Sequence, residues 1–140
     1  MQLNPYLGFN GKCEEAFKFY EKVLGGKITA RMTWGESPTP QKAPPDWKDK
    51  IMHARLVVGD NVIMGGDSPP DHYEQPKGIT VTINTDNAAE AERIFKALSE
   101  GGATRMPIQE TFWAQRFGMC TDRFGTPWMI NCEKKQAKAA

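Results

Sequence analysis

The fold is decided by a stretch of sequence that occurs twice. Residues 16–26 read AFKFYEKVLGG, and 75 positions later residues 91–101 read AERIFKALSEG. In both stretches apolar side chains recur every three or four positions, the spacing of one helix face, and glycine follows the last of them. The positions pair as Ala16 with Ala91, Phe19 with Ile94, Tyr20 with Phe95, Val23 with Leu98, and Gly26 with Gly101. The sequence therefore predicts two equivalent amphipathic helices, the first with an apolar face of Ala16, Phe19, Tyr20, Val23 and Leu24.

The segments that flank the two helices also repeat in the same order. Apolar and alternating runs predict one strand before each helix and three after it, at residues 6–9, 27–34, 51–58 and 62–64 in the first half and at 79–83, 104–108, 116–121 and 128–132 in the second. Each half thus reads βαβββ, which gives an α+β fold of two repeats, about 1–66 and 77–133. We expect the repeats to form a single domain over residues 1–133, because one such unit buries little apolar surface alone. Proline-rich loops are expected at 35–50 and 67–77, and a polar tail at 134–140.

Composition narrows the classes of partner. The 140 residues carry 18 Lys+Arg and 17 Asp+Glu, a net charge of +1, so no basic footprint for nucleic acid is present. No apolar run is long enough to span a membrane, and the glutamates within residues 1–25 do not fit a signal peptide. The three cysteines are odd in number and widely spaced, which predicts free thiols in a reducing compartment: Cys13, Cys120 and Cys132. We therefore expect a cytoplasmic protein with neither a nucleic-acid nor a membrane partner.

Several short motifs between residues 3 and 133 occur together in one group of proteins. They include Phe9-Asn10-Gly11, Leu24-Gly25-Gly26, Met52-His53-Ala54, Arg116-Phe117-Gly118 and the run from Asp122 to Asn131. With these motifs and the repeat, the chain resembles the vicinal oxygen chelate superfamily of glyoxalase I, extradiol dioxygenases, and fosfomycin and bleomycin resistance proteins. Within that superfamily it looks like the PhnB-like branch. The resemblance implies a cupped eight-stranded mixed sheet with the helices packed outside, and a homodimer.

The resemblance also implies a test for a metal ion. Enzymes of this superfamily hold a divalent metal in the cup, with ligands from the first and last strand of each half. The corresponding positions here lack His, Asp and Glu, since they are Pro5, Met64, Thr80 and Met129. The two histidines, His53 and His72, form no metal-binding spacing, and no glycine-rich nucleotide loop is present. We therefore expect neither a metal nor a cofactor.

Aromatic side chains are the remaining candidates for a working surface. An aromatic cup with few polar groups suits a planar or amphipathic small molecule. We expect the ligand site to use Trp34, Trp47, His53, Trp113, Arg116 and Trp128. Arg116 can pair with a carboxylate of the ligand, and His53 is a candidate general base. The competing interpretation is that the aromatics are core residues and that His53 is a strand histidine bonded across the sheet.

The sequence thus favours a PhnB-like protein of the glyoxalase/bleomycin-resistance type that holds a small organic molecule in an aromatic cup without a catalytic metal. One alternative is a metal-dependent or His53-based lyase, isomerase or dioxygenase of the same superfamily. Another is a protein that binds a partner chain through its sheet. The branch also carries the name of a demethylubiquinone methyltransferase, but the chain has no glycine-rich loop for a methyl donor. The sequence alone does not decide whether the protein is an enzyme.

Overall fold

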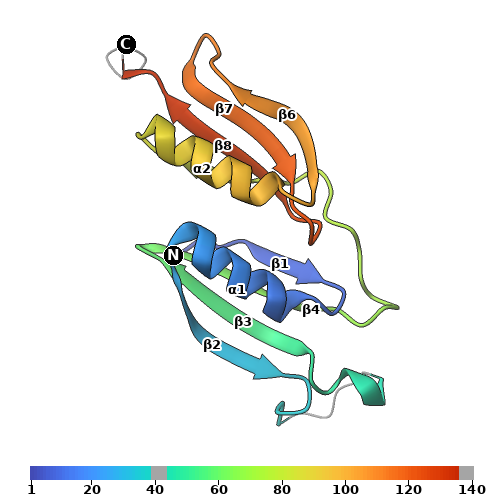
Figure 1. The fold of residues 1–140 in the computed structure, drawn as a ribbon. Coiled ribbons are helices and arrows are strands. Elements are labelled where there is room, and N and C mark those ends of the chain that lie inside the picture. The colour runs from blue at the N-terminus through green and yellow to red at the C-terminus, as the bar shows by residue number, and fades with distance from the viewer. Residues whose placement is uncertain (39–43, 136–140) are drawn as a thin grey trace. The chain divides into compact units, whose positions relative to one another are not determined.

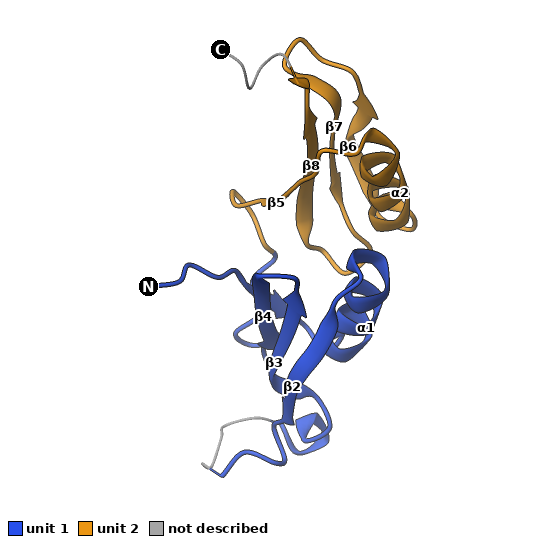
Figure 2. Ribbon diagram, turned by 90° about the vertical axis from the view of Figure 1, so that its left-hand side faces the viewer, with its two compact units in different colours: residues 1–75 blue, residues 76–140 orange. Residues whose placement is uncertain are grey.

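Two βαβββ units make up the structure, a computed structural model that describes residues 1–38 and 44–135 (Figure 1). The units comprise residues 1–75 and 76–140, and each has its own sheet and its own helix (Figure 2). The boundary falls within the segment that separates the two repeats in the sequence. Parts of the predicted first proline-rich loop (39–43) and of the polar tail (136–140) lie outside the described residues.

The first unit is a four-stranded mixed sheet with one helix. Its elements are β1 (Tyr6–Phe9), α1 (Cys13–Leu24), β2 (Lys27–Thr33), a 3₁₀ turn η1 (Pro45–Trp47), β3 (Ile51–Val58) and β4 (Asn61–Asp67). The strands lie in the order β1-β4-β3-β2. The pair β1–β4 is parallel and the other pairs are antiparallel.

The second unit repeats this topology. Its elements are β5 (Val81–Asn84), α2 (Ala88–Ser99), β6 (Ala103–Gln109), β7 (Ala114–Thr121) and β8 (Pro127–Glu133), with the strand order β5-β8-β7-β6. The pair β5–β8 is parallel and the others are antiparallel. The fold is therefore α+β, and the predicted duplication is confirmed: in the described residues, eight strands form two four-stranded mixed sheets. Ile79 is an exception to the predicted bounds, because it precedes β5 and is exposed.

Each helix packs one apolar stripe against its sheet. The stripe on α2 is the predicted one, with Ala91, Ile94, Phe95 and Leu98 buried. On α1 the buried side chains are Cys13, Ala16, Phe17, Tyr20 and Val23. The prediction for Phe19 and Leu24 is thus wrong: both are only half-buried, because Phe17 takes the inner position beside Tyr20. Neither 12-residue helix is long and apolar enough to cross a membrane.

The two inner phenylalanines are accommodated by glycines in the strands beneath them. A Cβ atom added to Gly65 of β4 would lie 2.9 Å from the Phe17 ring, and one added to Gly118 of β7 would lie 2.7 Å from the Phe95 ring. No side chain other than hydrogen fits at either position without moving the ring. The glycines therefore let each helix approach its sheet closely.

Candidate functional site

The first unit contains a cavity of about 400 Å³ between its sheet and the second proline-rich loop. Residues from β1, β3 and β4, from the turn after β2 and from the loop after β4 line it: Tyr6, Trp34, Met52, Gly66, Asp67, Ser68, Pro69 and His72. The lining combines aromatic and sulfur-containing surface with a few polar groups. This is the usual composition of a small-molecule site.

Asp67, at the end of β4, connects the segments around the cavity. Its side chain is buried, with only 3% exposed. Oδ1 accepts hydrogen bonds from the backbone N–H groups of Gly11 at 2.8 Å and Cys13 at 2.9 Å, and Oδ2 accepts one from Ile51 N–H at 2.9 Å. A carboxylate with three such donors is well satisfied in a buried position. It joins the turn before α1 and the start of β3 to the end of β4.

Two aromatic walls of the cavity are held by hydrogen bonds to backbone carbonyls. Trp34 Nε1–H donates to the Asp67 carbonyl at 3.1 Å, and the Tyr6 hydroxyl donates to the Met52 carbonyl at 3.2 Å. Burial, followed by the nearby Cys13 and Asp67, raises the pKa of the Tyr6 phenol. The phenol therefore keeps the proton that it donates. Because the polar tips of both rings are already bonded, the rings have defined positions before any ligand arrives.

The polar side chains of the cavity come from the loop after β4. Within the described part of the chain, neither the Ser68 hydroxyl nor the His72 imidazole has a side-chain hydrogen-bond partner. The loop itself is ordered by backbone bonds, from Ser68 N–H to the Phe9 carbonyl at 2.7 Å and from His72 N–H to the Pro69 carbonyl at 2.8 Å. Both side chains can thus donate to or accept from a bound molecule.

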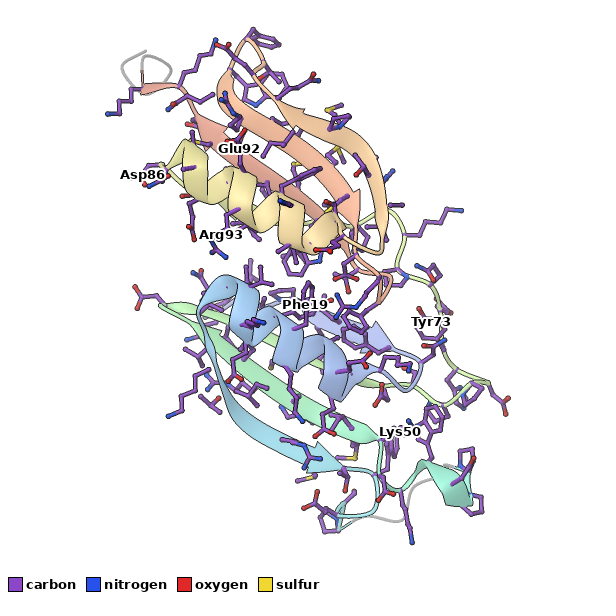
Figure 3. All side chains as sticks on the ribbon, in the orientation of Figure 1. Phe19, Lys50, Tyr73, Asp86, Glu92 and Arg93 are labelled. Atoms are coloured by element: carbon purple, nitrogen blue, oxygen red, sulfur yellow. The ribbon has the colours of Figure 1, made fainter. Side chains whose placement is uncertain are left out.

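Three of the six predicted ligand-binding residues lie in the first unit, and each has a different environment. Trp34 lines the cavity. His53 does not line it, but its ring stacks on the Tyr6 ring with the centroids 6.2 Å apart. Trp47 is buried in η1, where Lys50 Nζ lies 6.0 Å from the centroid of its ring (Lys50 is labelled in Figure 3). Trp47 therefore belongs to the packing of the first loop.

Two of the predicted tryptophans lie in the second unit. Trp113 is 36% exposed and contacts two other aromatic rings edge to face, with centroids 4.7 Å from Phe112 and 5.2 Å from Phe117. Trp128 is 1% exposed, and its Nε1–H donates to Asp122 Oδ2 at 2.8 Å. Trp128 is thus placed in the core of its unit.

Arg116, the sixth predicted residue, already has protein partners. Its Nε lies 3.2 Å from Glu92 Oε1 of α2, and its Nη1 donates to the Gln115 carbonyl at 2.6 Å. The ion pair is largely exposed to solvent, so it is weak. A ligand carboxylate would have to compete with Glu92 for this guanidinium.

The positions where the superfamily places metal ligands carry poor donors in this structure. Pro5 and Thr80 precede their strands, so the residues paired with Met64 and Met129 in the parallel ladders are Tyr6 and Thr82. Thr82 Oγ1 lies 3.7 Å from Met129 Sδ. A phenol, a hydroxyl and two thioethers do not match the imidazole and carboxylate donors that common divalent metals prefer. Over residues 1–38 and 44–135, no group of three or more His, Cys, Asp or Glu side chains is suitably placed for a metal ion.

A comparison with protein families identifies the chain. The family described as 3-demethylubiquinone-9 3-methyltransferase has a sequence model that matches residues 1–131. The chain belongs to this family.

Relatives of this PhnB-like family member match nearly all of the chain. Protein YjdN from Escherichia coli (strain K12) is 36% identical over 146 residues, which cover 97% of this chain and 98% of YjdN. Protein PA1353 from Pseudomonas aeruginosa has a crystal structure with 54% identity and a TM-score of 0.88, over 95% of this chain and 98% of that one. A putative 3-demethylubiquinone-9 3-methyltransferase, PhnB protein, from Bacillus cereus shares the fold at 20% identity and a TM-score of 0.79, over 94% and 99% of the two chains.

More distant structures share the fold of this PhnB-like protein. A glyoxylase/bleomycin resistance protein/dioxygenase domain from Frankia and the fosfomycin resistance protein FosX from Mesorhizobium loti have TM-scores of 0.62 and 0.60. Their identities of 12% and 14% support likeness of fold alone. The resemblance stated from the sequence is confirmed at the level of family and fold.

Sequence reasoning missed most of the cavity lining in this PhnB-like protein. Asp67, Ser68 and His72 had been assigned only to an irregular loop. One signal was present, because Asp67 is an acidic residue that stands two glycines after the apolar strand segment and begins the second proline-rich loop. Such a residue is often needed to satisfy backbone donors where strands and loops meet.

Proposed function

We propose that this protein binds a small organic molecule with a planar or aromatic part in the first-unit cavity, without a catalytic metal. The observation that carries the proposal is the pair of aromatic walls, Trp34 and Tyr6, each fixed by a hydrogen bond to a backbone carbonyl. The cavity volume of about 400 Å³ falls in the range of small-molecule sites.

The lining indicates the chemistry of the ligand. Trp34 and Tyr6 offer aromatic surface to a flat group, and the flexible Met52 thioether adapts to its outline. Ser68 and His72 can each make a hydrogen bond with a polar substituent. A flat ring system with one or two polar groups at one edge fits this arrangement.

Binding without a metal follows from the donors at the expected ligand positions. Pro5, Met64, Thr80 and Met129 offer no imidazole or carboxylate there. Elemental analysis of purified protein should find less than about 0.1 equivalent of Zn, Ni, Mn or Fe. A stoichiometric metal that survives dialysis would overturn this part of the proposal.

Ligand binding is preferred to two other activities. Methyl transfer, which the family description names, needs a bound methyl donor, and the sequence has no glycine-rich loop to hold one. Catalysis by His53 has less support, because His53 contacts Tyr6 and does not line the cavity.

We also propose that the protein is a homodimer, as the superfamily resemblance implies, and that it is cytoplasmic, since its three cysteines are free. Light scattering coupled to size-exclusion chromatography tests the dimer.

A screen of thermal stability tests the binding proposal. A few hundred aromatic fragments, together with S-adenosylmethionine, are added to the protein, and compounds that raise the midpoint of unfolding are titrated. Trp34→Leu should weaken the binding of these compounds about five- to tenfold, which is the free-energy contribution of one aromatic contact. Trp113→Leu, a matched loss of a partly exposed tryptophan in the other unit, should leave their affinity unchanged.

Three outcomes would count against the proposal. In the first, no fragment stabilises the protein. In the second, the hits keep full affinity in Trp34→Leu. In the third, S-adenosylmethionine is the only compound that binds, which would favour methyl transfer.

A further inference from the structure

A row of three methionines crosses the second sheet. Met106 of β6 is the ladder partner of Met119 of β7, and Met119 is the ladder partner of Met129 of β8. The three strands lie side by side in the order β8-β7-β6 (Figure 1). Residues directly opposite each other in antiparallel strands place their side chains on one face, with Cβ atoms about 4.5–5.5 Å apart. The three thioethers are therefore neighbours on a single face of the sheet.

That face is the one turned away from α2. Gly118 faces the helix, because a Cβ atom added there would lie 2.7 Å from the Phe95 ring. Side chains alternate along a strand, so Met119 lies on the opposite face. Met106 is 37% exposed, and Met119 and Met129 are half-buried. The row is thus accessible to a small ion from solvent.

The thiol sulfurs of this unit lie on the helix side of the sheet. Cys120 directly follows Met119, so it occupies the other face. Cys132 is the ladder partner of Arg116, whose side chain pairs with Glu92 of α2. Both cysteines are fully buried. A metal ion that reaches the open face therefore meets thioether sulfur before it meets a thiol.

We propose that the methionine row binds a soft monovalent metal ion, Cu(I). Thioethers are soft ligands that select Cu(I), whereas hard ions such as Mg²⁺ and Ca²⁺ take oxygen ligands. The unbranched methionine side chain has three rotatable bonds, so sulfurs from three neighbouring strands can approach one ion above Met119. Thr82 Oγ1 donates to Met129 Sδ at 3.7 Å, which uses one lone pair of that sulfur and leaves the other for the metal. The site belongs to the second unit and does not depend on the function proposed for the first-unit cavity.

NMR of the methionine methyl groups tests this site. Protein labelled with [methyl-¹³C]methionine gives a signal for each of its seven methionines. It is titrated with silver nitrate in chloride-free buffer, because Ag(I) is an air-stable ion of the same charge and softness as Cu(I), and then with Cu(I) under anaerobic conditions. The signals of Met106, Met119 and Met129 should shift together and saturate when one ion is bound per chain, and zinc nitrate should leave them in place. The proposal is overturned if these three signals do not move, if all seven move alike, or if Zn²⁺ acts as Ag(I) does.

Substitution by leucine separates coordination from folding, because leucine replaces methionine at nearly constant volume. Since even outer partners of metal ligands contribute about 10- to 100-fold to affinity, Met129→Leu should bind Ag(I) about tenfold more weakly or worse. Met64→Leu is the matched control in the last strand of the first unit, where the ladder partners are Tyr6 and Arg55 and no thioether lies opposite. It should bind as the wild type does, and thermal unfolding checks that both variants fold. Unchanged affinity in Met129→Leu, or an equal loss in Met64→Leu, contradicts the assignment.

Discussion

Asp67→Asn tests how the walls of the first-unit cavity are held. The substitution keeps the size of the side chain but replaces one carboxylate oxygen by an NH₂ group. Gly11 and Cys13 donate to Oδ1, and Ile51 donates to Oδ2. If the amide oxygen keeps the first two donors, the NH₂ group meets the N–H of Ile51. That buried donor then has no acceptor.

The size of the effect follows from these three bonds. An unsatisfied buried N–H costs about 1–3 kcal/mol, and each remaining bond loses about 1 kcal/mol when its acceptor is no longer charged. Relief from burying a charge offsets part of this loss. We expect Asp67→Asn to lower the free energy of unfolding by about 2–4 kcal/mol, and Asp67→Ala, which removes all three acceptor contacts, by more.

Urea unfolding followed by tryptophan fluorescence and circular dichroism measures the loss. The midpoint should fall with little change in slope if the native state remains compact. Asp60→Asn, at an exposed position in the turn before β4, is the matched control and should change stability by less than about 0.5 kcal/mol. If Asp67→Asn is as mild as Asp60→Asn, the carboxylate does not hold the cavity together.

Two further predictions concern the second unit. Gly118→Ala should destabilise the protein by about 1–3 kcal/mol in urea unfolding, because the new methyl group would lie 2.7 Å from the Phe95 ring. Gly8→Ala has open space and should cost less than about 0.5 kcal/mol; equal effects would refute the packing argument. Burial, and then the charge of Asp122, raises the pKa of the Cys120 thiol from its ordinary value to about 11. Because the unfolded thiol ionises first, stability should be intact below about pH 9 and decline between pH 9 and 11 by about 1–3 kcal/mol. The decline should be smaller in Cys120→Ala, and a flat profile in the wild type would contradict the assignment.

The architecture could be predicted because it depends on local periodicity and on the repeat. The helical spacing and the glycines after each helix fixed both helices, and alternation located the strands to within a few residues. The error at Phe19 shows the limit of this reasoning. Phe17 and Phe19 are both apolar and both near the predicted face. The space opened by Gly65, 48 residues after Phe17 in sequence, decides that Phe17 points inward.

The candidate site was less predictable because its contacts join distant segments. Asp67 bonds backbone groups up to 56 residues away, and periodicity carries no information about such bonds. The pairing of Arg116 with Glu92 and the burial of Trp128 likewise depend on which faces of β7, β8 and α2 meet. Trp34 was predicted as an aromatic wall from its residue type, and it lines the cavity; that it binds a ligand stays a prediction.

The most direct test of the account is the response of the four tryptophan indole N–H signals in ¹H–¹⁵N spectra as screening hits are titrated. Trp34 lines the proposed site, whereas Trp128 is buried in the core of the other unit. We expect a saturable shift of the Trp34 signal and an unmoved Trp128 signal. The claim that the first-unit cavity is the binding site would be contradicted if the compounds leave the Trp34 signal unchanged and shift the signal of another tryptophan.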